Sequence, residues 1–156
     1  MIAGTPKRAA LALAIALTVL VPRWVLGADA SPTTFYVQLV RGNNETVPPA
    51  PGDKRVGIKV SLELHGIYRW RSYWEIARQE VTLPATGKTL VRLNKDRAVE
   101  IDLTTPGKRK VTAFENDKEV AITTRPVGTA WTVIGGERDR KTSWFIVVRR
   151  DKPADE

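Results

Sequence analysis

The chain has 156 residues, a formal net charge of +8 and a hydrophobic content of 42%, which together fit one basic globular domain. It has no cysteine, so disulfides, thiolate metal sites and cysteine nucleophiles are excluded. Its single histidine excludes a multi-histidine metal site within one chain, and we expect neither a metal nor another cofactor.

Residues 1–30 have the pattern of a cleavable export signal. Lys7 and Arg8 precede an apolar run over 9–21, and a small-residue A-x-A-like site ends at Ala30. The run is shorter than the roughly 20 apolar residues that a membrane-spanning helix needs. The pattern therefore predicts a periplasmic or extracellular protein, with an uncleaved signal anchor or a buried apolar segment as the alternatives.

The segment after the signal predicts strands separated by turns. Residues 35–40 are rich in β-forming side chains, and a loop rich in proline and glycine follows over 41–57. Residues 57–65 alternate between apolar and polar side chains, which predicts a half-buried strand with His65 on its wet face. The side chains expected to point inward from this strand are Ile58, Val60, Leu62 and Leu64.

The second half of the chain continues in the same way. Residues 68–83 predict one strand or a bent pair, with a bulge near Ala77–Gln79 where the alternation shifts. Asn116 and Asp117 predict a tight hairpin turn. Further strands are expected over 89–93, 98–103, 110–115, 119–124, 130–134 and 143–148, the last of them central.

These elements predict an all-β fold. No segment of ten or more residues has a helical period, and strands that are apolar on one face are buried by stacking two sheets. We expect a single antiparallel β-sandwich over residues 31–150, with an immunoglobulin-like topology favoured over a compact β-barrel. Residues 151–156 are expected to form a polar tail.

An aromatic and basic segment over 68–74 is the first candidate binding site. Exposed tryptophan and tyrosine rings stack on sugar rings or on nucleic-acid bases, and arginine and tryptophan are enriched at interface hot spots. The alternative is that one aromatic face is core, with arginine stems covering its edge. The candidate partner-binding residues are Tyr68, Arg69, Trp70, Arg71, Tyr73 and Trp74.

The charged loop over 135–141 is the second candidate. Its flanking residues Trp131 and Trp144 are expected to be neighbours on paired strands. Clustered positive charge favours anionic partners, whereas the alternative is ordinary solvated charge. The candidate anion-binding residues are Arg138, Arg140, Lys141, Arg149 and Arg150.

Paired carboxylates offer the remaining enzymatic hypothesis. Glu100 and Asp102 lie on one face of a predicted strand, at a Cα spacing of roughly 6.5–7 Å that overlaps glycosidase carboxyl pairs. Any exposed strand produces the same spacing, so a solvated face is the competing interpretation. His65 has no nucleophile context, and we assign no catalytic residue.

The functional hypothesis that follows is a non-enzymatic, exported all-β interaction module that binds another envelope or cell-surface protein. The first alternative is binding of an anionic polysaccharide or a membrane surface through the arginine and aromatic residues. The second alternative is a carboxylate-based hydrolase. A nucleic acid is not an expected partner for an exported protein, and the sequence does not indicate an oligomeric state.

Overall fold

A computed structural model describes residues 31–137 and 139–154. The predicted export signal over 1–30 therefore lies outside the described residues. The elements are β1 (Thr33–Asn43), β2 (Lys54–Arg55), α1 (Ile58–Ile67), β3 (Ser72–Leu83), β4 (Lys88–Arg92), β5 (Arg97–Asp102), β6 (Lys108–Glu115), β7 (Lys118–Pro126), β8 (Trp131–Glu137) and β9 (Thr142–Arg149).

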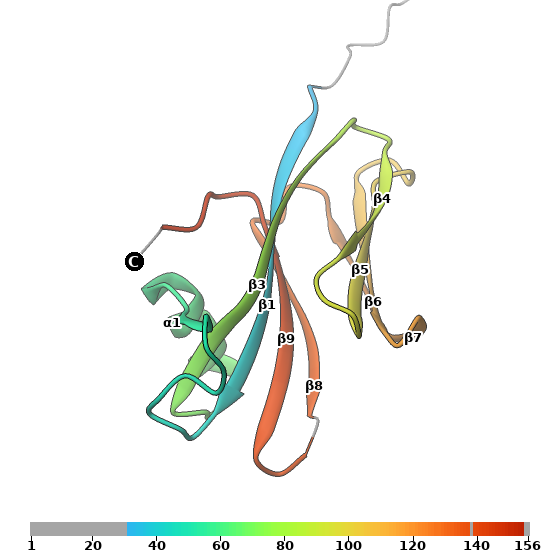
Figure 1. Cartoon of the computed structure of the whole chain (residues 1–156). Helices are drawn as coiled ribbons and strands as arrows, with labels where there is room; N and C mark the ends of the chain where they lie inside the picture. Colours follow the sequence, from blue (N-terminus) through green and yellow to red (C-terminus); the bar gives the residue numbers. More distant parts are fainter. Residues whose placement is uncertain (1–30, 138, 155–156) are drawn as a thin grey trace, which may run out of the picture.

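The strands form two antiparallel sheets, which confirms the predicted sandwich. One sheet has the order β2-β3-β1-β9-β8 and the other the order β4-β5-β6-β7. Figure 1 shows three layers, with α1 on the side of the five-stranded sheet that faces away from β4–β7. No ladder joins β7 to β8 in the described part of the chain, so the sheets do not close into a barrel.

The strand order of this sandwich can be compared with that of immunoglobulin domains. Strands β4 to β7 follow one another in chain order, and the chain passes between the sheets at β3–β4 and β7–β8. Immunoglobulin domains instead interleave their strands as sheets A-B-E-D and C-F-G. The all-β sandwich is therefore shown, and its strand order differs from the interleaved immunoglobulin order.

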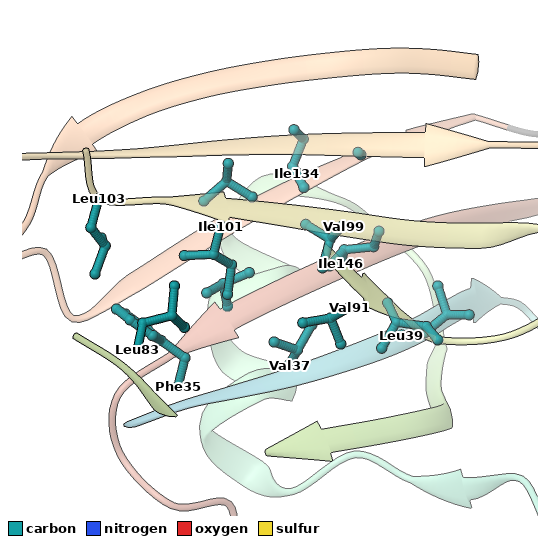
Figure 2. Packing of buried hydrophobic residues seen from close by; sticks show 14 residues of the cluster. Phe35, Val37, Leu39, Leu83, Val91, Val99, Ile101, Leu103, Ile134 and Ile146 are labelled. Atoms are coloured by element: carbon teal, nitrogen blue, oxygen red, sulfur yellow. The ribbon is translucent and has the colours of Figure 1, made fainter. Parts of the chain in front are cut away.

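The main hydrophobic core lies between the two sheets (Figure 2). Alternate residues of the strands point into it, because successive side chains of a strand face opposite sides of the sheet. This inter-sheet core consists of Phe35, Val37, Leu39, Leu83, Val91, Leu93, Val99, Ile101, Leu103, Val111, Ala113, Ile134, Ile146 and Val148.

A second core lies on the outer face of the five-stranded sheet, beneath α1. It exists because β9 carries apolar side chains on both faces, so the outer face also needs a cover. We call it the outer cluster, and its buried members are Val40, Val56, Val60, Leu64, Tyr73, Phe145 and Val147.

The strand predicted over 57–65 is wrong, because these residues belong to α1. Val60 and Leu64 are one turn apart, so a helix places both against the outer cluster. Ile58 and Leu62 then face away from the sheet and are 61% and 66% exposed. The apolar–polar alternation fits a strand locally, but the outer cluster of the five-stranded sheet is covered by this segment as a helix, through Val60 and Leu64.

Two predicted local features are confirmed. The β1–β3 ladder shifts register between Leu39 and Val40, which leaves Ile76 as the bulged residue, next to the predicted position. Asn116 and Asp117 both have positive φ, at 50° and 61°, as a two-residue hairpin turn of type I′ requires.

Candidate functional site

The aromatic segment over 68–74 is divided between the core and the surface. Tyr73 and Trp74 are each only 2% exposed. The Tyr73 hydroxyl donates to the carbonyl oxygen of Tyr68 at 2.8 Å, and burial raises the pKa of Tyr73. The Trp74 Nε1 donates to Oδ1 of Asn43 at 3.0 Å. Both rings are therefore used inside the protein and present no face to a partner.

The other residues of this segment lie nearer the surface. Tyr68 and Trp70 are half-buried against the outer cluster, and the Tyr68 and Phe145 ring centroids are 4.4 Å apart. Arg69 and Arg71 are exposed. The aromatic residues of this segment thus pack against the outer cluster. The side chains here that a partner could contact are chiefly the two arginines.

The outer face of α1 adds exposed residues that the sequence did not assign to a site. Ile58 and Leu62 are 61% and 66% exposed, and we call these two residues the helix patch. Ile67 is 58% exposed at the C-terminal end of α1, but it lies nine residues after Ile58 and therefore on the other side of the helix. The charged neighbours of the helix patch, Lys59 and Glu63, are also exposed. The strand predicted over 57–65 placed Ile58 and Leu62 on its buried side, so the sequence did not indicate this exposed surface.

Hollows lie at both ends of α1. Beyond the C-terminal end of α1 is a shallow depression of about 500 Å³, lined by Ile67, Tyr68, Arg69, Trp70 and Ser143. Near its N-terminal end is a smaller hollow of about 100 Å³, which α1 shares with the segment after β9. The smaller hollow includes Ile58 in its lining and therefore borders the helix patch.

A polar cleft of about 690 Å³ lies at the end of the sandwich where β1 ends and β9 begins. The Arg97 guanidinium lies 4.0 Å from the Trp144 ring centroid and pairs with Glu115 at 2.7 Å. The charged residues lining the cleft are Arg41, Arg97, Lys141, Glu45, Asp96, Glu115 and Asp139. This mixture of signs does not favour an anionic polymer over a neutral one.

The expected pairing of the two flanking tryptophans is wrong. In the β8–β9 ladder, Trp131 is opposite Arg149, whereas Trp144 is opposite Gly136. Trp131 packs against the outer cluster and Trp144 against the inter-sheet core, so they lie on opposite faces of the sheet. They differ in face because Trp144 is opposite Gly136, which is five residues after Trp131 on β8, and an odd separation along a strand changes the face.

The candidate anion-binding residues do not form one surface in the described part of the chain. Arg140 and Lys141 precede β9, whereas Arg149 and Arg150 lie at its far end, about 25 Å away for an eight-residue strand. Arg149 is buried, stacks 4.0 Å from the Trp131 ring centroid and donates from Nε to Oδ1 of Asp151 at 3.0 Å. Arg138 lies outside the described residues.

The Arg149–Asp151 pair should make folding stability depend on pH. Hydrogen bonds from Arg149 lower the pKa of Asp151 below its ordinary 3.8, so the carboxylate stabilises the fold above that range. The pair is partly exposed, and we expect Asp151→Asn to lose about 1 kcal/mol near neutral pH. Urea unfolding from pH 7 to pH 2 should show this difference disappearing as the pH falls through the folded pKa. A difference that stays constant with pH would contradict the assignment.

The carboxylates of the hydrolase hypothesis lie in surface ion pairs on the outer face of the four-stranded sheet. Lys88 Nζ is 3.0 Å from Glu100 Oε2, and Lys110 Nζ is 3.8 Å from Asp102 Oδ2. The Thr104 hydroxyl and backbone N–H donate to Asp102 and lower its pKa, which favours its charged form. Both carboxylates are thus engaged by lysines of neighbouring strands, with their side chains 18% and 12% exposed.

Two absences among the described residues bear on the site. No group of three or more acidic or histidine side chains there is placed to hold a metal ion, and no helix there is long and apolar enough to cross a membrane. Comparisons with family models, curated proteins and solved structures found no match for the chain.

Proposed function

We propose that this protein is a non-enzymatic, exported interaction module that binds another envelope or cell-surface protein through the helix patch. The observation that supports this proposal is the exposure of Ile58 and Leu62, one turn apart on a ten-residue helix whose opposite face is packed. Burying an aliphatic side chain of this size is worth about 1.5–3 kcal/mol. A protein partner that covers the patch would gain that free energy.

The helix patch is not required by the core. Val60 and Leu64 already fill the face of α1 that meets the outer cluster. Ile58 and Leu62 lie one turn apart on the opposite face, where polar residues would support a helix equally well. Adjacent exposed aliphatic side chains of this kind mark interaction surfaces more often than isolated ones do.

The surroundings of the helix patch indicate the chemistry of the partner. An apolar centre with a charged rim is the usual arrangement of a protein–protein interface. The exposed charged residues of α1 and of the segment that follows it are Lys59, Glu63, Arg69 and Arg71, which carry a net positive charge. The small hollow that Ile58 lines can receive a partner side chain. We therefore expect the partner to present an apolar surface bordered by acidic residues.

The variant Leu62→Asp tests the proposal. It should weaken partner binding at least tenfold, because a carboxylate would be buried against an apolar surface with no compensating charge. The binding partner is first identified by affinity purification from envelope extract, and the dissociation constant is then measured with both proteins purified. Folding stability should change by less than about 0.5 kcal/mol, since Leu62 faces solvent.

Leu90→Asp is the matched control, because Leu90 is also exposed but lies on β4 of the other sheet. Its dissociation constant should equal that of the unmodified protein. Equal affinities for the Leu62 and Leu90 variants would overturn the proposal. Binding to protein-free anionic vesicles that is lost in the Leu62 variant would also overturn it, in favour of a membrane surface.

A further inference from the structure

Arg109 is a fully buried cation at the end of the sandwich opposite the polar cleft. Its side chain is 0% exposed, and it lies on the face of β6 that carries Val111 and Ala113 into the inter-sheet core. Its Nη2 donates to Oγ1 of Thr132 at 2.5 Å, and its guanidinium is 5.3 Å from the Phe35 ring centroid. Its Nε and Nη1 are buried and have no hydrogen-bond partner.

The buried charge of Arg109 is energetically unfavourable in these surroundings. A guanidinium has five N–H donors and keeps its charge in proteins, so burial with a single hydroxyl partner leaves most of its hydration uncompensated. A buried charge is ordinarily paired with an opposite one, and removing that partner is strongly destabilising. Burial and the nearby Arg150 lower the pKa of Arg109, which is the effect expected where positive charge lacks a counterion.

Two further arginines lie around Arg109. Arg125 is directly opposite it in the β6–β7 ladder, and Arg150 follows β9 and donates its backbone N–H to the carbonyl oxygen of Ala130. Both are exposed, and in the described part of the chain no carboxylate forms an ion pair with any of the three. Like charges directly opposite in a ladder repel, so the cluster is destabilising unless an anion joins it.

We propose that Arg109, Arg125 and Arg150 form a binding site for a single phosphate or sulfate group. Guanidinium groups match such oxyanions with paired, charge-assisted hydrogen bonds. The unpaired Nε and Nη1 of Arg109 are the innermost donors of the site, and because Arg109 is 0% exposed an anion reaches them only when the side chains that cover it move aside. The exposed side chains of Arg125 and Arg150 form the outer part of the site. The group is either a free ion or the terminal group of a larger molecule such as a glycan or a lipid. This site is separate from the helix patch and does not depend on the proposed function.

Titration of the full chain with inorganic phosphate or sulfate, at an ionic strength held constant with sodium chloride, tests the proposal. Calorimetry should show saturable binding of one anion, and Tm should rise with anion concentration toward saturation. Arg125→Gln and Arg150→Gln change exposed residues, so both variants should stay folded and bind at least tenfold more weakly. Arg140→Gln, at the other end of β9, is the control and should bind like the unmodified protein.

Arg109→Leu provides a second, independent readout. In buffer free of phosphate and sulfate this variant should have a Tm equal to or higher than that of the unmodified protein, because it removes a buried charge without a partner. The anion-dependent rise of Tm should be absent from it. A lower Tm without the anions, or an anion response equal in the Arg125, Arg150 and Arg140 variants, would overturn the proposal.

The same variants show whether the phosphate or sulfate group is a free ion or part of a larger molecule. A sugar phosphate, a sulfated oligosaccharide and a vesicle containing an anionic phospholipid are each compared with free phosphate. Tighter binding of one of them, lost in Arg150→Gln, supports the site and identifies the molecule that carries the group. Binding of all four that is unaffected by Arg150→Gln contradicts the site.

Discussion

The Phe145→Ala variant should lose about 3–5 kcal/mol of folding stability, the range measured for removing a buried aromatic side chain. Phe145 is 0% exposed and lies at the centre of the outer cluster, between the five-stranded sheet and α1. Its ring centroid is 4.4 Å from that of Tyr68 and 6.1 Å from that of Tyr73. Removing the ring therefore opens a cavity beneath the helix and loosens the support of the helix patch.

Guanidinium chloride unfolding of the two proteins measures this loss directly. Phe114→Ala is the control, because Phe114 is only half-buried on β6 of the other sheet. It should lose clearly less stability than the Phe145 variant. A loss below about 1 kcal/mol for Phe145→Ala would contradict the packing of α1 on the outer cluster.

The Gly135→Ala variant should be the second most damaging change. A Cβ at this position of β8 would lie 2.4 Å from the carbonyl oxygen of Trp144 and 2.8 Å from Cδ1 of Phe145. The first contact is with backbone, which cannot move without disturbing the β8–β9 ladder. We expect a loss of about 3 kcal/mol, at the upper end of the range for overpacked sites.

Gly136→Ala is the matched control for this effect. At the next position of the same strand, the nearest atom to an added Cβ is Cζ2 of Trp144, at 3.9 Å. That variant should be neutral or slightly stabilising, because alanine restricts the unfolded chain more than glycine does. Thermal unfolding distinguishes the two variants. Equal Tm values would contradict the close approach of β9 to Gly135.

The strands could be predicted from the sequence where apolar and polar residues alternate and the apolar ones are buried on one face of a sheet. In β5, Val99 and Ile101 point into the inter-sheet core, and Glu100 and Asp102 lie on the opposite face of the sheet, as the pattern indicates. The same rule is wrong for Ile58 to Leu64, because it cannot detect that another part of the chain needs a covering layer. That need was visible in the apolar run over 145–148, since a strand with both faces apolar must be covered on both sides.

The candidate sites were harder to predict than the strands. Trp74 and Arg149 look like surface residues in the sequence, but cation–π stacking and hydrogen bonds allow both to be buried. Arg109 lies between two lysines, which suggests an exposed strand end. Its alternation with Val111 and Ala113 is the signal that would have placed it in the core.

The proposal that the outer face of α1 is the interaction surface is tested most directly by crosslinking in cells that make the protein. A photo-crosslinking amino acid replaces Leu62 in one variant and Leu90, on the other sheet, in a second. The proposal predicts one discrete covalent adduct with a protein from position 62, and none from position 90. An adduct from position 90 with none from position 62 would contradict it.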